Sequence, residues 1–209
     1  MNGTTKDRLV TAAAALMDKG GQTAVTLRAV AEAVGVSHNA PYRHFKDRNA
    51  LLAGVAERDF KQLSCGFRTA SAEDSAGVGG PLKAAAMTLI TYARAHPARY
   101  HLLFSDPDFA SVGGSPEIAA LDAFGVFSAI VGRCQVEGML PQTETAKLTG
   151  LIYATLHGSI DLELGGRAKE RKGLGDIEST LDLLLDVLRQ NEASSVSSQD
   201  QSTAYDRAK

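Results

Sequence analysis

A run of hydrogen-bonding side chains near residue 40 has the composition of a surface that contacts another polymer. The run comprises Ser37, His38, Asn39, Tyr42, Arg43 and His44. An asparagine amide can form paired hydrogen bonds with adenine in the major groove of DNA, while hydroxyl, phenol and imidazole groups suit phosphate oxygens. Few of these residue types would be chosen merely to keep a surface hydrated. The run therefore predicts contact with nucleic acid.

The pattern around this run predicts a helix-turn-helix. Thr26 can cap a short apolar helix over residues 27–34, and Gly35 can take the left-handed conformation that ends it. A second short helix is expected over residues 37–45, with Pro41 near its start. Such a unit leaves its second helix protruding, so that its first residues can face base edges in a major groove. An amphipathic helix over residues 5–19 is expected before it.

The string from Thr26 to Ser37, followed by Ala40 to Phe45 and then Ala50 to Leu52, resembles the DNA-binding domain of TetR-family transcriptional regulators. The resemblance covers about residues 5–60 and implies double-stranded DNA as the partner. The family often has a lysine three residues after the phenylalanine, where this chain has Arg48. The expected DNA-binding residues are Thr26, Arg28, Ser37, His38, Asn39, Tyr42, His44, Lys46 and Arg48.

These candidates divide into three tasks. Thr26 and Arg28 stand at a helix start, where free backbone amides and a guanidinium can hold a phosphate. The alternatives are a helix cap alone for Thr26 and a base edge for Arg28. The expected readers of base edges are Ser37, His38 and Asn39. The set that resembles the family's clamp on the DNA backbone is Tyr42, His44, Lys46 and Arg48.

The composition is that of a globular protein with a basic first quarter. Of its 209 residues, 44% are hydrophobic and 22% charged. Residues 1–61 carry nine basic and six acidic side chains, a formal charge of +3, and the remainder carries 13 and 18, a charge of −5. No apolar run approaches the length of a membrane helix, and charges stand where a secretory signal would be apolar, so we expect a cytoplasmic protein. Cys65 and Cys134 lack the spacing of a zinc site or a disulfide framework.

The rest of the chain also has helical periodicity, so an all-α fold is predicted throughout. The polar, glycine-rich stretch Ser71 to Gly80 is expected to be a loop. We predict a helix-turn-helix domain over residues 1–62, a helical ligand-binding and dimerisation domain over 63–191, and a disordered tail over 192–209. The helices expected in the second domain span about 81–95, 97–104, 116–138, 142–164 and 176–190.

Two strings in this second domain resemble the C-terminal domain of a TetR subgroup named for a Trp-His-Gly motif. They run from His96 to Phe104 and from Leu156 to Leu164, with Leu156 in place of the tryptophan. The resemblance implies a homodimer formed through helices 142–164 and 176–190, and a small-molecule effector. The side chains that could line its pocket, with plain packing in the core as the alternative for each, are Tyr92, His96, Tyr100, Phe104, Phe124, Phe127, Tyr153 and His157.

The function expected from these resemblances is a homodimeric repressor that binds a palindromic operator and is released by the effector. A helical protein-interaction module is the alternative, and salt-sensitive DNA binding would distinguish the two. An enzyme is not expected, because Ser159, His157 and Asp161 on one helix do not form a triad. No cofactor is expected, and His157 with Asp161 lacks a third metal ligand.

Overall fold

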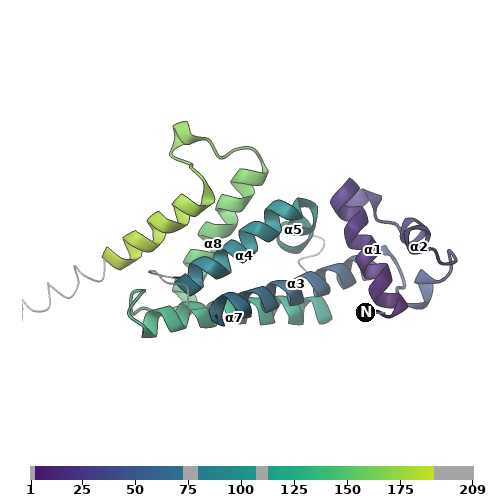
Figure 1. Cartoon of the computed structure of the whole chain (residues 1–209), viewed down its shortest axis with the longest axis horizontal. Coiled ribbons are helices and arrows are strands. Elements are labelled where there is room, and N and C mark those ends of the chain that lie inside the picture. The colour runs from purple at the N-terminus through teal and green to yellow at the C-terminus, as the bar shows by residue number, and fades with distance from the viewer. Residues whose placement is uncertain (1–2, 73–79, 107–112, 191–209) are drawn as a thin grey trace, which may run out of the picture. The chain divides into compact units, whose positions relative to one another are not determined.

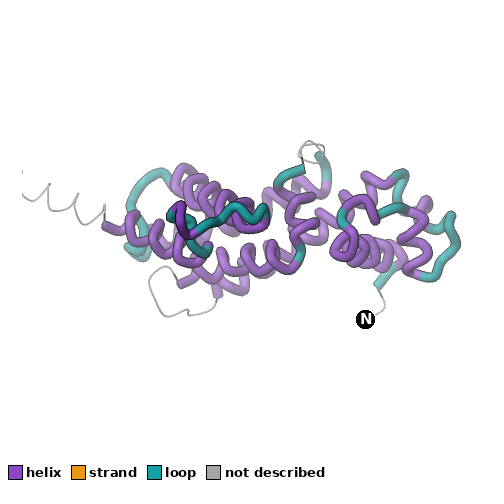
Figure 2. Tube along the Cα trace, turned by 90° about the horizontal axis from the view of Figure 1, so that it is seen from above, coloured by secondary structure: helices purple, strands orange, loops and turns teal. Residues whose placement is uncertain are grey.

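A computed structural model describes residues 3–72, 80–106 and 113–190 of the chain. Within these residues the backbone forms only helices and connecting loops, as Figure 2 shows, so the all-α prediction is confirmed. None of the helices in the described ranges is long and apolar enough to cross a membrane. The predicted tail and most of the predicted loop at 71–80 lie outside the described residues.

The chain divides into two compact units, each built from two segments of sequence. One unit comprises residues 1–66 and 91–124, and the other comprises 67–90 and 125–209. We call them the N-terminal unit and the C-terminal unit. Three helices pass from one unit into the other: α3 (Arg48–Ala72), α4 (Gly80–Ala95) and α7 (Ser115–Val136). The boundary near residue 62 stays a prediction.

The N-terminal unit opens with α1 (Thr5–Gly20), which packs against α2 (Leu27–Val34) (Figure 1). A capping box starts α1: the amide of Asp7 donates to the Thr4 hydroxyl, and the Asp7 carboxylate accepts from the Thr4 amide. Its buried stripe is Leu9, Val10, Ala13, Ala14 and Met17. The 3-10 turn η1 (Gln22–Ala24) joins the two helices. The helix predicted over 5–19 is therefore confirmed.

The helix predicted over residues 37–45 is shorter and tighter than expected. Its regular part is the 3-10 turn η2 (Pro41–Arg43), preceded by a turn over residues 38–40. Bonds to the third residue back dominate, as from the Arg43 amide to the Ala40 carbonyl at 3.2 Å. Pro41 explains the difference, because it has no N–H to donate to the Ser37 carbonyl and so cannot continue an α-helical ladder.

The starts of the remaining helices lie close to the predicted ones in both units. In the N-terminal unit, α5 (Pro97–Phe104) has the predicted bounds. In the C-terminal unit, α8 (Thr145–Leu164) and a helix over residues 177–190 begin within three residues of their predicted starts. The buried face of α8 includes Leu148, Ile152, Leu156 and Ile160, and that of the last helix includes Ile177, Leu181 and Leu185. A 3-10 turn, η3 (Glu170–Lys172), lies between them.

Candidate nucleic-acid interface

The start of α2 is built as the sequence predicts. Thr26 has extended backbone geometry, and its hydroxyl accepts a hydrogen bond of 3.0 Å from the Ala29 amide. This bond satisfies one of the free donors in the first turn. The side chains of Thr26 and Arg28 are both exposed, whereas Leu27 between them is buried. A hydroxyl, free amides and a guanidinium thus lie together at the positive end of the helix dipole.

A left-handed glycine ends α2 and sets the direction of the following segment. Gly35 has a φ of 73° and a ψ of 37°, where a side chain would be strained. The Val36 amide then donates to the Ala31 carbonyl at 3.0 Å, which closes the helix end. The chain can therefore turn sharply into the segment that carries the predicted DNA contacts.

The segment after this turn is anchored by two apolar residues and exposes its polar ones. Pro41 and Phe45 are buried, and Phe45 is only 4% exposed. Tyr42 is 60% exposed although it is a large aromatic residue. The polar side chains exposed on the segment and just after it are Ser37, His38, Asn39, Arg43, His44 and Lys46. The structure therefore gathers all predicted base readers and most of the predicted backbone clamp on one short stretch of surface.

Arg48 is placed differently from the other predicted contacts. Its Nε donates to the Val25 carbonyl at 2.8 Å, and its Nη2 donates to the Gln22 carbonyl at 2.5 Å. The side chain is half-buried, and two of its five N–H donors bond to backbone carbonyls just before α2. Arg48 therefore stabilises the connection between α1 and α2. The exposed cation beside it is Lys46, whose Nζ lies 3.9 Å from Asp47.

A second arginine holds the opposite end of α2, and the sequence analysis did not find it. The Nη2 of Arg8, on α1, donates to the Val34 carbonyl at 3.0 Å. α2 is thus held at its start by Arg48 of α3 and at its end by Arg8 of α1. No motif marks these roles, because each depends on a backbone carbonyl more than 20 residues away.

The eight predicted ligand-binding residues fall into the two units. In the N-terminal unit, Tyr92 and Tyr100 are buried, and Tyr100 packs against Phe104 at 5.1 Å between ring centroids. Phe124, in the same unit, is 38% exposed. His96 lies beside a carboxylate, with its Nδ1 3.1 Å from Asp18 Oδ2.

The other three form a cluster of ring contacts in the C-terminal unit. The rings of Phe127 and Tyr153 lie 5.7 Å apart, and those of Tyr153 and His157 lie 4.2 Å apart. Burial raises the pKa of Tyr153 to about 12 and lowers the pKa of His157 to about 4. His157 is therefore neutral at pH 7, and this ring cluster is uncharged.

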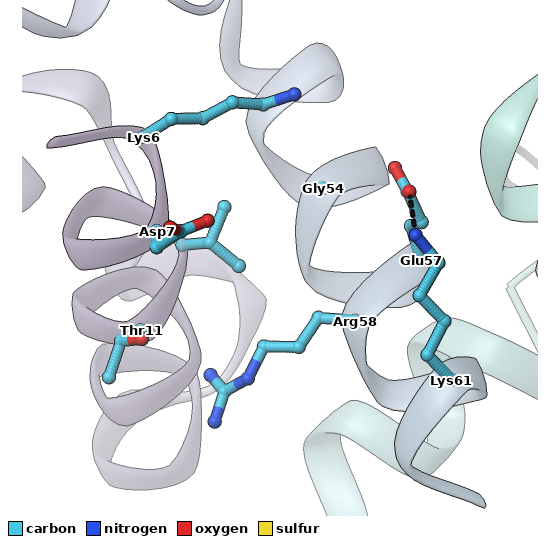
Figure 3. A pocket seen from close by; sticks show the side chains of 8 residues that line it. Lys6, Asp7, Thr11, Gly54, Glu57, Arg58 and Lys61 are labelled. Atoms are coloured by element: carbon cyan, nitrogen blue, oxygen red, sulfur yellow. Dashed lines mark hydrogen bonds and ion pairs between the residues drawn. The ribbon is translucent and has the colours of Figure 1, made fainter. Parts of the chain in front are cut away.

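A polar hollow that the sequence analysis missed lies between α1 and α3. It has a volume of about 400 Å³ and is lined by Lys6, Asp7, Val10, Thr11, Gly54, Glu57, Arg58 and Lys61 (Figure 3). Its carboxylates have internal partners: Asp7 accepts from Thr4, and Glu57 pairs with Lys61. These contacts hold the pKa of both carboxyls below the usual range. None of the predicted site residues lines this hollow.

Two family models match the chain. The model described as "Bacterial regulatory proteins, tetR family" matches residues 9–55. The model described as "Tetracyclin repressor-like, C-terminal domain" matches residues 82–188. The first match includes α2, the turn at Gly35 and the exposed segment that follows.

Individual proteins resemble the chain in sequence or in fold. The nucleoid occlusion factor SlmA of Actinobacillus pleuropneumoniae is 32% identical over 88 residues, 42% of this chain. The chain spans only 43% of the length of this curated relative. A solved structure of a Rhodococcus sp. RHA1 protein of unknown function is 25% identical with a TM-score of 0.76, and covers 92% of this chain and 97% of its own. The fatty acid degradation regulator FadR of Bacillus halodurans shares the fold, with a TM-score of 0.68, 14% identity, and 90% and 96% coverage.

Proposed function

The chain belongs to the TetR family of regulatory proteins, and on that premise we propose that it is a DNA-binding transcriptional regulator. The observation that carries the proposal is the exposed polar segment over residues 37–46, which follows a capped helix and a left-handed turn. Tyr42 is central to it, because its phenol is 60% exposed and its hydroxyl is therefore available to a phosphate oxygen.

The contacts to DNA divide into backbone and base contacts. Thr26, Arg28, Tyr42, His44 and Lys46 contact phosphates, which supplies affinity without sequence preference. Arg48 supports them indirectly, because its guanidinium is bonded to the chain just before α2. The bases are read by Ser37, His38 and Asn39, which open the exposed segment.

The regulator acts as a homodimer on a palindromic operator. Both proposed dimer helices, 142–164 and 176–190, carry a second face that is not buried in the chain: Leu151 is 49% exposed, Leu183 64% and Val187 48%. Gly150, Ala154 and Gly158 lie exposed on α8 at every fourth residue, which permits close approach of another helix. Two-fold symmetry of the protein then requires two-fold symmetry of the site.

We propose repression that a small molecule relieves. The effector would bind in the C-terminal domain. Among the predicted lining residues, the ring cluster of Phe127, Tyr153 and His157 suits a largely apolar ligand with one polar group. Its effect is limited to the difference between its affinities for the two states of the protein. The string Leu156-His157-Gly158 supports membership of the Trp-His-Gly subgroup. We place the protein in the cytoplasm, where the DNA of a bacterium lies, and we propose no catalytic role and no cofactor.

The test is fluorescence anisotropy of the purified protein on the DNA upstream of its own coding region, in a salt series, with scrambled DNA as the control. We expect preferential binding to the upstream DNA, and a steep loss of affinity with salt because each phosphate contact releases a counterion. Equal binding to both DNAs at every salt concentration, or binding to neither, would contradict the proposal.

A further inference from the structure

A buried ion network joins α1 and α3, which flank α2, to α5, through partners that lie 81 and 40 residues apart in sequence. Arg99, on α5, is 5% exposed and contacts two carboxylates at once. Its Nε and Nη2 donate to Asp18 of α1 at 2.9 and 3.1 Å. Its Nη1 donates to both oxygens of Asp59 of α3, at 3.1 and 2.9 Å. All three residues belong to the N-terminal unit.

The surroundings make this network costly to rearrange. Asp59 is fully buried and also accepts a hydrogen bond of 2.9 Å from the Tyr92 hydroxyl. Breaking a buried ion pair leaves a buried charge without its counter-ion, so separating Asp59 from Arg99 would be strongly destabilising. Asp18 lies nearer the surface, with its side chain 28% exposed and His96 Nδ1 at 3.1 Å.

The two helices that Arg99 joins are the same two that hold α2. Arg8 of α1 binds the carbonyl at the end of α2, and Arg48 of α3 binds the carbonyls that precede it. A shift of α1 against α3 would therefore act on both ends of α2 through these bonds. A further hydrogen bond links the α1–α2 connection to the end of α5. The Gln22 side-chain amide donates to the carboxylate of Asp106, just after α5, at 2.7 Å.

We propose that Arg99 is a positioning residue for DNA binding: its guanidinium holds α1 and α3 in the arrangement that presents α2 and the segment after Gly35 to DNA. This inference rests on the proposed DNA-binding function. It also means that residues 1–62 do not by themselves contain everything that the DNA-binding surface needs. A planar fork is required, because a lysine ammonium cannot satisfy two carboxylates from different helices with the same geometry.

The experiment compares Arg99→Lys with Lys83→Met. The first keeps the charge beside Asp59, so the unit can still fold, but it loses the fork. The second is the matched control, because it breaks the long-range ion pair of Lys83 with Asp182 in the C-terminal unit. Asp18→Asn, at the more exposed end of the network, is a second variant. For each protein we would measure DNA affinity by anisotropy and amide hydrogen exchange of α2 and α8 without DNA.

For Arg99→Lys and Asp18→Asn we expect about tenfold weaker DNA binding, the size of one charged hydrogen bond. We also expect faster exchange of the α2 amides with unchanged exchange in α8, and neither effect in Lys83→Met. Equally faster amide exchange in α2 and α8 would show that Arg99 contributes only to the general stability of the fold, and would overturn the inference. Unchanged DNA affinity would overturn it as well. If the wild-type protein binds no DNA, the proposed function fails, whereas exchange in α2 still decides whether Arg99 positions that helix.

Discussion

Single side chains in the exposed segment have separable effects on DNA binding. Tyr42→Phe removes a hydroxyl that we assign to a phosphate, so binding to all DNA sequences should weaken alike. Asn39→Ala removes an amide that we assign to a base edge, so preference at one position in each half-site should relax. Anisotropy on an operator and its single-base variants measures both. Equal, sequence-independent losses in the two variants would contradict the assignment of Asn39 as a reader.

His157 makes the stability of the protein depend on pH. Burial lowers the pKa of His157 to about 4 from an ordinary 6.5. Between these values the unfolded chain binds a proton that the folded chain does not, so stability falls as the pH falls. The loss from pH 7 to pH 5 should be about 2 kcal/mol.

Urea unfolding of the wild type and of His157→Gln at both pH values measures this contribution. The variant should lose that part of the pH dependence, whereas His101→Gln, at an exposed histidine, should keep it. An unchanged pH dependence in His157→Gln would show that His157 is not the group responsible.

At the scale of elements, the turn after α2 depends on the absence of a side chain. Gly35→Ala places a β-carbon on a residue with a φ of 73°, which should lower the free energy of unfolding by about 1–2 kcal/mol. Thermal or urea denaturation measures the change. Gly125→Ala is the matched control, because this glycine lies in α7 with open space around it, and there alanine should stabilise by about 0.5–1 kcal/mol. Equal effects of the two substitutions would contradict the role given to the turn.

At the scale of the whole molecule, the proposed dimer predicts the effect of a large charged residue on the exposed face of α8. Such a residue should prevent dimerisation but leave the fold of each subunit intact. A side chain at Gly158 meets no atom of its own chain within 4 Å. Gly158→Arg should therefore fold, sediment as a monomer, and lose most of its operator affinity because only one half-site is held. Gly125→Arg, at the equally open glycine of α7, should remain dimeric. A dimeric Gly158→Arg would place the interface elsewhere.

The sequence by itself determined the local structure of the proposed DNA-binding segment. A threonine cap, a glycine in the left-handed region and short helices with apolar stripes are set by neighbouring residues, and the structure has them at Thr26, Gly35 and α2. The length of the helix after Gly35 was predicted wrongly, because the effect of Pro41 on the backbone bonds was underestimated.

Only the tertiary structure decided which charged side chains face outward and which hold the helices together. Arg28 and Arg48 have the same chemistry and similar positions near helix starts, yet one is exposed and the other binds backbone carbonyls before α2. Arg8 and Arg99 likewise gain their roles from partners 26 to 81 residues away. Because such pairings form only when distant helices pack, no local pattern of residues predicts them.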